Sequence, residues 1–191
     1  MSIMSWNCRG LGKSFAILQC QKLTQVYKPD ILFLMETKLV EGKGKDVWIR
    51  CGFSDGWEVP RVGLSGGLIL AWINRHSLQI NFVSNHLIHI DLLDSKGTPV
   101  SITFFYGHPD HARREEIWQQ LSSLKAYAQS NWLCIVHFNQ VLNKEENFSF
   151  TQGSIVGAEL FQQVISNLQL CDLAASGQNS LGQITEKRMS L

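Results

Sequence analysis

In Asn131-Trp132-Leu133-Cys134-Ile135-Val136-His137-Phe138-Asn139, a short apolar run leads directly into two polar side chains that flank a phenylalanine. The run from Leu133 to Val136 has the length of a buried strand and is too short for an independent helix. A buried strand that ends in polar groups is how an α/β domain presents chemistry at the edge of its sheet. His137 and Asn139 would also be ordinary at the start of a loop, so the interpretation depends on the rest of the chain.

The composition is that of a soluble globular protein with one domain. The chain has 191 residues, of which 45% are hydrophobic and 17% charged, and this is enough material for a sizeable core. The formal net charge of +1 provides no global field to attract nucleic acid. Any contact with DNA would therefore depend on a local patch of charge.

The cysteines and the first residues indicate an intracellular protein. Five cysteines are scattered without a C-x-x-C pair, which argues against a disulfide framework and against a zinc site. Trp6, Asn7 and Arg9 stand where a signal peptide would have its apolar core, and no segment reaches membrane-spanning length. We therefore expect a cytosolic or nuclear protein without a membrane partner.

The order of predicted elements indicates an α/β sandwich. Strands are predicted at 2–7, 31–35, 67–73, 78–83, 86–93, 100–106 and 133–136, with a further short one at 171–173. Helices are predicted at 14–27 with Ser14 as N-cap, near 45–50, at 110–129 with Asp110 as N-cap, and at 157–168. The remainder of 40–67 is expected to be irregular. Two sheets packed face to face with helices outside suit this order, as one domain over residues 1–175 followed by an irregular tail at 176–191.

Four polar side chains share a position at the end of a predicted strand. Asn7, Glu36, Tyr106 and Asn139 each end such a strand or follow it closely. This shared position predicts that they meet at one rim of the sandwich. Magnesium prefers hard oxygen ligands and keeps several waters, so a single carboxylate can hold it. Amide and phenol groups can donate hydrogen bonds to a phosphate as negative charge develops.

Four segments in order resemble a known superfamily. They are Ser5-Trp6-Asn7-Cys8-Arg9-Gly10-Leu11-Gly12, Pro29-Asp30-Ile31-Leu32-Phe33-Leu34-Met35-Glu36-Thr37-Lys38, Tyr106-Gly107-His108-Pro109 before a helix with Trp118, and Val136-His137-Phe138-Asn139. Together they resemble the endonuclease/exonuclease/phosphatase superfamily, and in particular the N-terminal endonuclease domain of plant non-LTR retrotransposons. The similarity extends from Met4 to about Leu173.

The resemblance implies a four-layered αββα sandwich of two mainly antiparallel sheets that nicks DNA with a divalent metal. The nick would supply a 3′ hydroxyl that primes reverse transcription. By the same resemblance, Glu36 would hold the magnesium ion and Asn7 would orient the phosphate and the metal's waters. Tyr106 would contact the scissile phosphate, and Asn139 would hydrogen-bond near the nucleophile. No small-molecule cofactor is implied.

Two departures from the family pattern predict impaired catalysis. Relatives carry Gly-Asp-Phe-Asn at 136–139, so His137 replaces the Asp that aligns or deprotonates the attacking water. Imidazole is a poor group beside magnesium, and its charged form would be repelled by the ion. Family members also end in a Ser-Asp-His run, whereas this sequence has no His after His137, and we expect the C-terminal part of the domain to be incomplete.

Two alternatives stay open on the sequence alone. His137 could act as the general base, and the chain would then be an active magnesium-dependent phosphodiesterase. The chain could instead be a non-catalytic nucleic-acid-binding or interaction module, because Asn, Glu and Tyr at strand ends are also ordinary loop and strand residues. Our interpretation is a domain derived from a retrotransposon endonuclease, with DNA as the ancestral substrate and impaired nicking.

Overall fold

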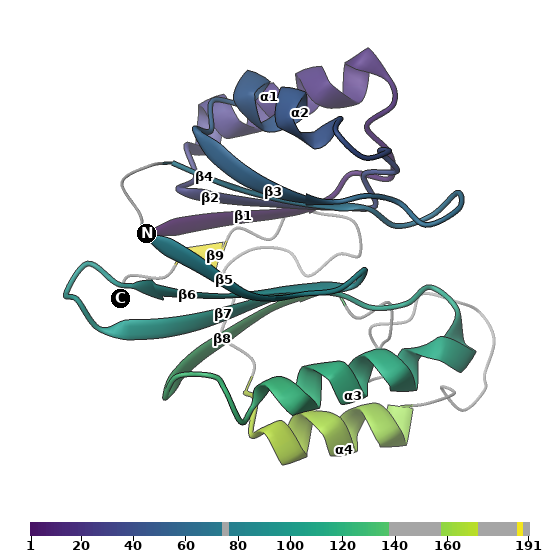
Figure 1. Ribbon diagram of the computed structural model, residues 1–191, viewed down its shortest axis with the longest axis vertical. Helices are drawn as coiled ribbons and strands as arrows, with labels where there is room; N and C mark the ends of the chain where they lie inside the picture. Colours follow the sequence, from purple (N-terminus) through teal and green to yellow (C-terminus); the bar gives the residue numbers. More distant parts are fainter. Residues whose placement is uncertain (74–76, 138–157, 172–186, 189–191) are drawn as a thin grey trace.

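The computed structural model describes residues 1–73, 77–137, 158–171 and 187–188. Two sheets pack face to face and helices cover their outer faces, which gives four layers in the order helix, sheet, sheet, helix (Figure 1). Helices α1 (Ser14–Tyr27) and α2 (Gly44–Arg50) cover one sheet. Helices α3 (Arg114–Leu124) and α4 (Ala158–Leu168) cover the other. The predicted αββα sandwich is confirmed.

The first sheet has the strand order β3-β4-β2-β1-β9. Its strands are β1 (Ser2–Asn7), β2 (Ile31–Met35), β3 (Asp55–Val59), β4 (Leu68–Trp72) and β9 (Lys187–Arg188). Strands β1 and β2 are parallel and joined by α1, while the other neighbours pair antiparallel. Both β1 and β2 therefore end at the same edge of the sheet, as the strand-end argument requires.

The second sheet has the order β5-β6-β7-β8. Its strands are β5 (Leu78–Val83), β6 (Leu87–Leu93), β7 (Pro99–Tyr106) and β8 (Asn131–His137). The first three form the predicted antiparallel meander, and β8 pairs parallel to β7 after the crossover through α3. Because β7 and β8 run together, Tyr106 and His137 stand side by side in register at their ends.

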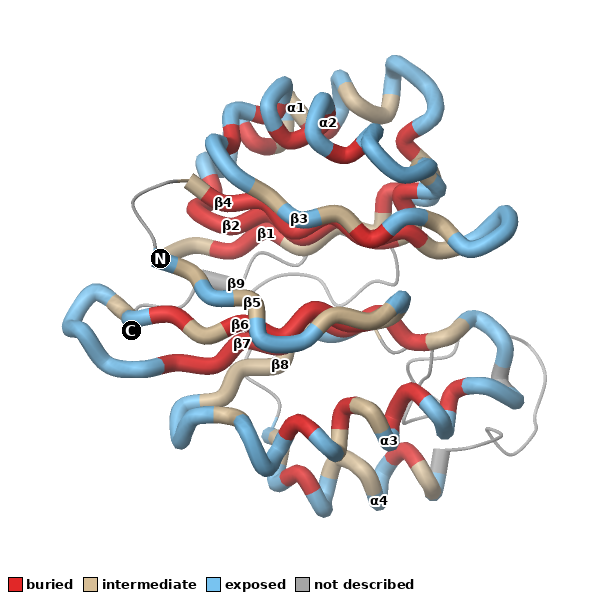
Figure 2. The backbone as a smooth tube through the Cα atoms, viewed as in Figure 1, coloured by how far each residue is buried: buried red, intermediate tan, exposed pale blue. Residues whose placement is uncertain are grey.

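The core lies in three layers, between the two sheets and between each sheet and its helices. In β2, Ile31, Phe33 and Met35 belong to the layer between the sheets, while Leu32 and Leu34 pack toward α1 and α2. Phe33 meets Phe104 of β7 with ring centroids 5.1 Å apart and ring planes at 45°. Figure 2 shows that burial concentrates on the strands and on the helix faces turned toward them. This packing fixes the distance between the sheets.

Strand β3 corrects the expectation of irregular structure across 40–67. Gly56 indicates a turn by composition, yet it lies inside β3 and pairs with Ala71. A Cβ on Gly56 would come within 2.7 Å of the Trp48 indole on α2. The glycine is therefore required by the close approach of α2, a contact that the local sequence does not reveal.

The helix boundaries also differ in places from the sequence prediction. Lys13 occupies the N-cap of α1 with extended backbone, so Ser14 is the first helical residue rather than the cap. Asp110 accepts a hydrogen bond from the Ala112 amide and caps the 3₁₀ turn η1 (His111–Arg113) instead of α3 itself. Helix α3 ends at Leu124 and not at 129, because the chain turns back there toward β8.

The C-terminal predictions fall mostly outside the described residues. Of the short strand expected at 171–173, only Cys171 is described, and it is not in a strand. Within the segment expected to be an irregular tail, Lys187–Arg188 form β9 and pair antiparallel with Ser2 and Ile3 of β1. Among the described helices, none combines the length and the apolar character needed to cross a membrane.

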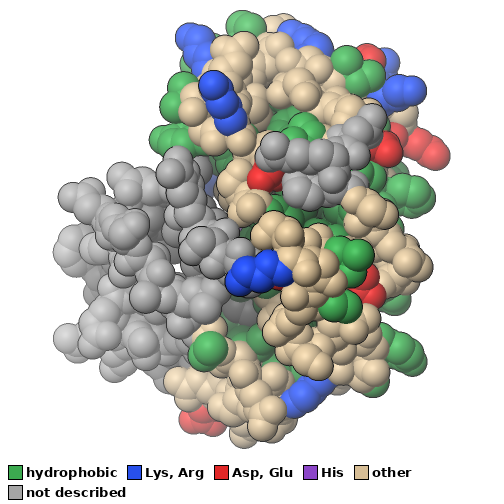
Figure 3. Space-filling view, turned by 90° about the vertical axis from the view of Figure 1, so that its left-hand side faces the viewer, with side chains coloured by type: hydrophobic (Ala, Val, Ile, Leu, Met, Phe, Trp, Pro, Cys, Tyr) green, Lys and Arg blue, Asp and Glu red, His purple; other side chains and the backbone are tan. Residues whose placement is uncertain are grey.

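The surface charges agree with the small net charge. Figure 3 shows the face that carries the starting ends of β1 and β7, opposite the rim where these strands end. Basic, acidic and hydrophobic side chains are interspersed over its coloured part. This distribution suits a chain whose formal net charge is +1.

His89 predicts a stability that falls in acid. Its side chain is 1% exposed, on the face of β6 that is turned away from the first sheet; Nδ1 lies 2.8 Å from Thr103 Oγ1, and Nε2 has no hydrogen-bond partner in the described structure. Burial lowers the pKa of His89 below its usual 6.5, against the smaller opposing effect of Asp91. The unfolded chain therefore binds a proton more tightly than the folded chain, and the unfolding free energy rises with pH up to about 6.5, by about 1.4 kcal/mol per unit of pKa shift.

We expect urea unfolding to give a lower unfolding free energy at pH 5.5 than at pH 7.5. In His89→Leu this difference should shrink, and part of it should remain because burial also lowers the pKa of His86. An unchanged difference in His89→Leu would show that His89 does not contribute to the pH dependence.

Candidate functional site

Glu36 is turned into the space between the sheets by an unusual backbone conformation. Continued alternation along β2 would place it with Leu32 and Leu34 on the helix side of the sheet. Its φ of 54° lies in the left-handed region, which non-glycine residues rarely adopt. The carboxylate consequently reaches the second sheet. Such a costly conformation at a strand end is characteristic of functional sites.

The Glu36 carboxylate accepts hydrogen bonds from both sheets. Asn7 Nδ2, at the end of β1, donates to Oε1 over 2.8 Å, and the Tyr106 hydroxyl, at the end of β7, donates to the same oxygen over 2.8 Å. Hydrogen bonds to a carboxylate are about twice as strong as neutral ones. Tyr106 is only 2% exposed, so this contact lies at the base of the rim. The residues predicted from three separate strand ends therefore meet.

The orientation of the Asn7 amide follows from its second contact. Its Oδ1 accepts a hydrogen bond from the Arg9 backbone amide over 3.2 Å. A backbone N–H can only donate, so the Asn7 atom that faces it must be the oxygen. The Nδ2 group must then face Glu36. The Asn7 side chain is thereby held at both ends.

His137 lies beside the same group of side chains. Its Nε2 is 3.4 Å from Asn7 Nδ2, and its ring lies parallel to that of Tyr106, with centroids 5.9 Å apart and planes at 7°. Because Asn7 Nδ2 can only donate, a hydrogen bond between them requires an unprotonated Nε2. Of the five predicted site residues, Asn7, Glu36, Tyr106 and His137 are thus together, while Asn139 lies outside the described residues.

Left-handed backbone is concentrated at this rim. Five described non-glycine residues have positive φ; Lys28 and Gln169 directly follow the ends of α1 and α4, where this conformation is usual. The other three are Arg9, Glu36 and Lys38, in the loops after β1 and β2. Their strain is opposed by backbone hydrogen bonds, from the Leu11 amide to the Thr37 carbonyl and from the amides of residues 37 and 38 to the carbonyls of residues 67 and 66.

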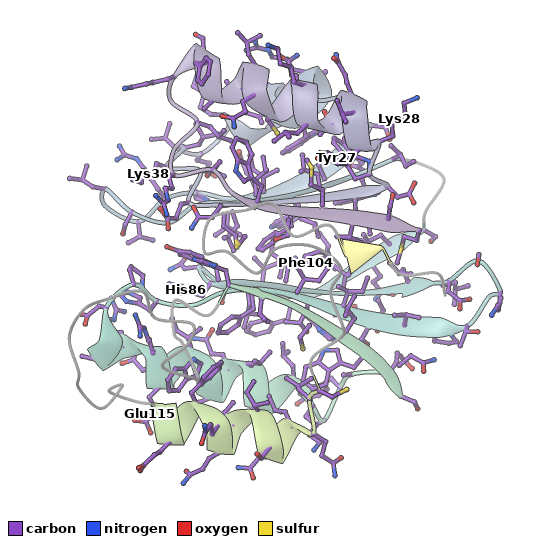
Figure 4. All side chains as sticks on the ribbon, turned by 180° about the vertical axis from the view of Figure 1, so that it is seen from behind. Tyr27, Lys28, Lys38, His86, Phe104 and Glu115 are labelled. Carbon is purple, nitrogen blue, oxygen red and sulfur yellow. The ribbon has the colours of Figure 1, made fainter. Side chains whose placement is uncertain are left out.

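The titratable groups around the rim differ in their readiness to react. Burial raises the pKa of the Cys8 thiol to about 12, so this neighbour of Asn7 stays protonated and is not a nucleophile. Burial lowers the pKa of His86, and the nearby His108 and Arg113 add to the effect. Lys38 and Arg9 are exposed cations on the loops that hold Glu36 and Asn7. Figure 4 shows Lys38 and His86 at the same end of the two sheets.

His86 is the residue of this rim that sequence reasoning missed. It precedes β6, directly opposite Tyr106 by the register that pairs Leu87 with Phe105. The available signal was the hairpin: residues 86 and 106 are almost equally far from the predicted turn at 94–97. Without the exact register, the alternation of β6 does not reveal which residue faces Tyr106.

No protein-family model matches the sequence, and no curated protein matches it significantly. Solved structures do match. The endonuclease domain of TRAS1, a telomere-specific non-LTR retrotransposon, aligns with 98% of this chain and 81% of its own at a TM-score of 0.63 and 10% identity. The chain has the endonuclease/exonuclease/phosphatase fold. The same fold relates it to a 3′-5′ exonuclease from Neisseria meningitidis (TM-score 0.63, 17% identity, 87% of this chain and 71% of that one).

A third example of the endonuclease/exonuclease/phosphatase fold is the catalytic domain of human Nocturnin. It covers 78% of this chain and 69% of its own, with a TM-score of 0.54 and 16% identity. At such identities the likeness concerns the fold, and it confirms the architecture that the four sequence motifs implied. The roles of the individual side chains do not follow from it.

Gly67 offers a test of how the loop after β2 is held. Its φ is +89°, and a Cβ there would meet the Thr37 hydroxyl and approach the Lys38 amide to 3.1 Å. Gly63 has a φ of +61° with nothing within 4 Å of such a Cβ. Left-handed backbone costs alanine about 1–2 kcal/mol at either position, and Gly67→Ala must in addition displace the loop that carries Glu36.

We expect Gly67→Ala to lower the unfolding free energy in urea by more than Gly63→Ala does. Gly63→Ala is the matched control, because it carries the backbone cost without the clash. Equal losses in the two variants would show that the contact between residue 67 and the loop after β2 does not hold that loop.

Proposed function

We propose that this chain is a nuclease domain of the retrotransposon-endonuclease type, acting on DNA phosphodiesters with a divalent metal, and that its nicking is impaired. The observation that carries the proposal is the Glu36 carboxylate, held by Asn7 from its own sheet and by Tyr106 from the opposite sheet. A hydrophobic core does not require this arrangement. The arrangement of Glu36, Asn7 and Tyr106 brings one carboxylate, one amide and one phenol together at a rim of the sandwich.

The Glu36 carboxylate is a sufficient protein ligand for magnesium. Among the described residues, no group of three His, Cys, Asp or Glu side chains could hold a metal ion. Magnesium needs only one or two carboxylates, because it keeps most of its waters. Both described hydrogen bonds to Glu36 end on Oε1, so Oε2 is left for the cation. The bound ion would supply charge to stabilise the transition state.

The neighbours of Glu36 suit a phosphate group. The Asn7 amide has a second N–H beside the one it donates to Glu36, whereas the single Tyr106 O–H would have to turn from Glu36 to the phosphate. In that arrangement each would stabilise negative charge as it develops on a phosphate oxygen. Their hydrogen bonds to Glu36 hold them in place before the substrate arrives, and this preorganisation is what makes such donors effective. The DNA substrate is supported by the solved structures that share the fold, which include a retrotransposon endonuclease domain.

His137 is the reason to propose impaired activity. The superfamily pattern has an Asp at this position, and a positioned general base typically contributes a factor of about 10²–10⁴. His137 lies next to Asn7 and Tyr106, so a side chain at this position reaches the site. An imidazole beside a divalent cation binds a proton weakly and, once protonated, is repelled by the ion. The substitution therefore keeps the geometry and weakens the chemistry.

The test is the conversion of supercoiled plasmid to open circles in the presence of Mg²⁺. We expect the unmodified chain to nick slowly. His137→Asp should nick about tenfold faster, because a carboxylate restores the base, yet stay impaired, because the sequence also lacks the Ser-Asp-His run of the family. Glu36→Gln in either background should abolish nicking, since the amide keeps the shape of the side chain and loses its charge. Replacing Mg²⁺ with EDTA should do the same.

Two other outcomes would favour the alternatives. Robust nicking by the unmodified chain, lost in Glu36→Gln and in His137→Ala, would show that His137 itself acts as the base. Binding of DNA that needs no Mg²⁺ and survives Glu36→Gln, without any nicking by His137→Asp, would favour a non-catalytic binding module.

A further inference from the structure

We propose that His86 is a positioning residue, which fixes the Tyr106 phenol on Glu36. This inference rests on the proposed function, because it concerns how the Tyr106 hydroxyl of the same site is held in place. His86 lies across from Tyr106 on the neighbouring strand and contacts neither Glu36 nor Asn7 in the described hydrogen-bond network. Its influence on the site would be exerted through Tyr106.

His86 binds both backbone polar groups of Tyr106. The Tyr106 amide donates to the His86 carbonyl over 2.7 Å, and His86 Nδ1 lies 3.1 Å from the Tyr106 carbonyl oxygen. A carbonyl only accepts, so Nδ1 carries the hydrogen. This hydrogen bond to Tyr106 therefore fixes the orientation of the His86 imidazole. An ordinary strand pair supplies backbone contacts alone, and here a side chain adds one at the last residue of β7.

The ring of His86 also stacks on the ring of Tyr106. Their centroids are 6.3 Å apart and their planes lie at 8°. The ring of His137, on the other neighbouring strand, also stacks on the Tyr106 ring, with centroids 5.9 Å apart and planes at 7°. The three rings form a ladder from the residue before β6, through the last residue of β7, to the last residue of β8, with the phenol in the middle. Parallel aromatic rings at such separations attract one another beyond the effect of their burial, so the ladder restricts the rotation of the Tyr106 ring.

The position of Tyr106 in the strand explains why such support matters. Tyr106 is the last residue of β7, where the sheet ladder ends and a loop begins. The hydroxyl lies at the far end of the side chain, so a small backbone rotation moves it away from Glu36. A misplacement of about 1 Å can cost a reaction as much as about 10²-fold. Contacts to the backbone and to the ring of the same residue control both sources of movement.

A role for His86 as a cationic phosphate ligand is less consistent with its surroundings. Burial is the main cause of its lowered pKa; the hydrogen bond to the Tyr106 carbonyl raises the pKa by less, and the nearby His108 and Arg113 add to the lowering. A phosphate ligand would have to be protonated, and these surroundings favour the neutral form. Positioning needs only the Nδ1 hydrogen and the ring, both of which the neutral imidazole provides.

The experiment compares His86→Ala with the unmodified chain by two readouts. The first is the NMR signal of the Tyr106 ring in protein labelled at tyrosine; the chain has three tyrosines, and Tyr106→Phe identifies the signal. The second is plasmid nicking with Mg²⁺. We expect the Tyr106 signal to shift in His86→Ala, and nicking to fall about tenfold or more in kcat with KM unchanged.

Three further variants separate the contacts. His86→Asn keeps a donor near Nδ1 and loses the ring, whereas His86→Phe keeps the ring and loses the donor, so both should lie between His86→Ala and the unmodified chain. His108→Ala is the matched control, because the His108 ring packs on His86 at 5.1 Å and is not stacked on Tyr106. It should leave the Tyr106 signal and nicking unchanged.

The two readouts keep the inference separate from the function on which it rests. An unchanged Tyr106 signal in His86→Ala overturns the inference, whatever happens to nicking. A shifted signal with unchanged nicking also overturns it, because Tyr106 would then move without consequence. If no variant nicks, including His137→Asp, the proposed function fails, and the Tyr106 signal still decides whether His86 holds this ring. Asn and Phe variants that both equal His86→Ala would exclude the two contacts as the cause.

Discussion

The packing of the two sheets is the constraint on which the candidate site depends. Phe33 and Phe104 meet at the centre of the layer between the sheets, and this layer sets how far apart the strand ends lie. At the rim, the same separation is bridged by the hydrogen bond from the Tyr106 hydroxyl to Glu36. A change in the thickness of the core would break that bond without touching either residue, because a hydrogen bond tolerates only a few tenths of an ångström.

Backbone strain at the rim directs the Glu36 side chain toward Tyr106. Arg9, Glu36 and Lys38 adopt left-handed backbone, at a cost of about 1–2 kcal/mol each. The backbone hydrogen bonds of the loops after β1 and β2 offset this cost, and Gly67 allows the segment before β4 to approach the loop after β2. The structure therefore spends stability on the direction of the Glu36 side chain, which is a common feature of sites that bind and react.

Two histidines flank Tyr106 at this rim. His137 stands on one side of Tyr106 and His86 on the other, so a phenol that donates to a carboxylate is enclosed by two imidazoles. An Asp at 137 would add negative charge beside Glu36, and the imidazole does not. The arrangement keeps the donors in place and provides less charge for a cation, and the proposed impairment of nicking rests on this difference.

The sequence by itself determined the layers of the fold and which strand ends meet. The apolar runs at Ile31–Met35 and before His137 are local signals, and the four ordered motifs placed Asn7, Glu36 and Tyr106 at one rim. Only the tertiary structure decided that β3 is a strand, that Glu36 turns against the alternation of β2, and that His86 faces Tyr106. These features depend on the packing of Trp48 on Gly56, on backbone strain offset by a distant loop, and on hairpin register. Each depends on how separate elements pack or pair, so no local pattern encodes it.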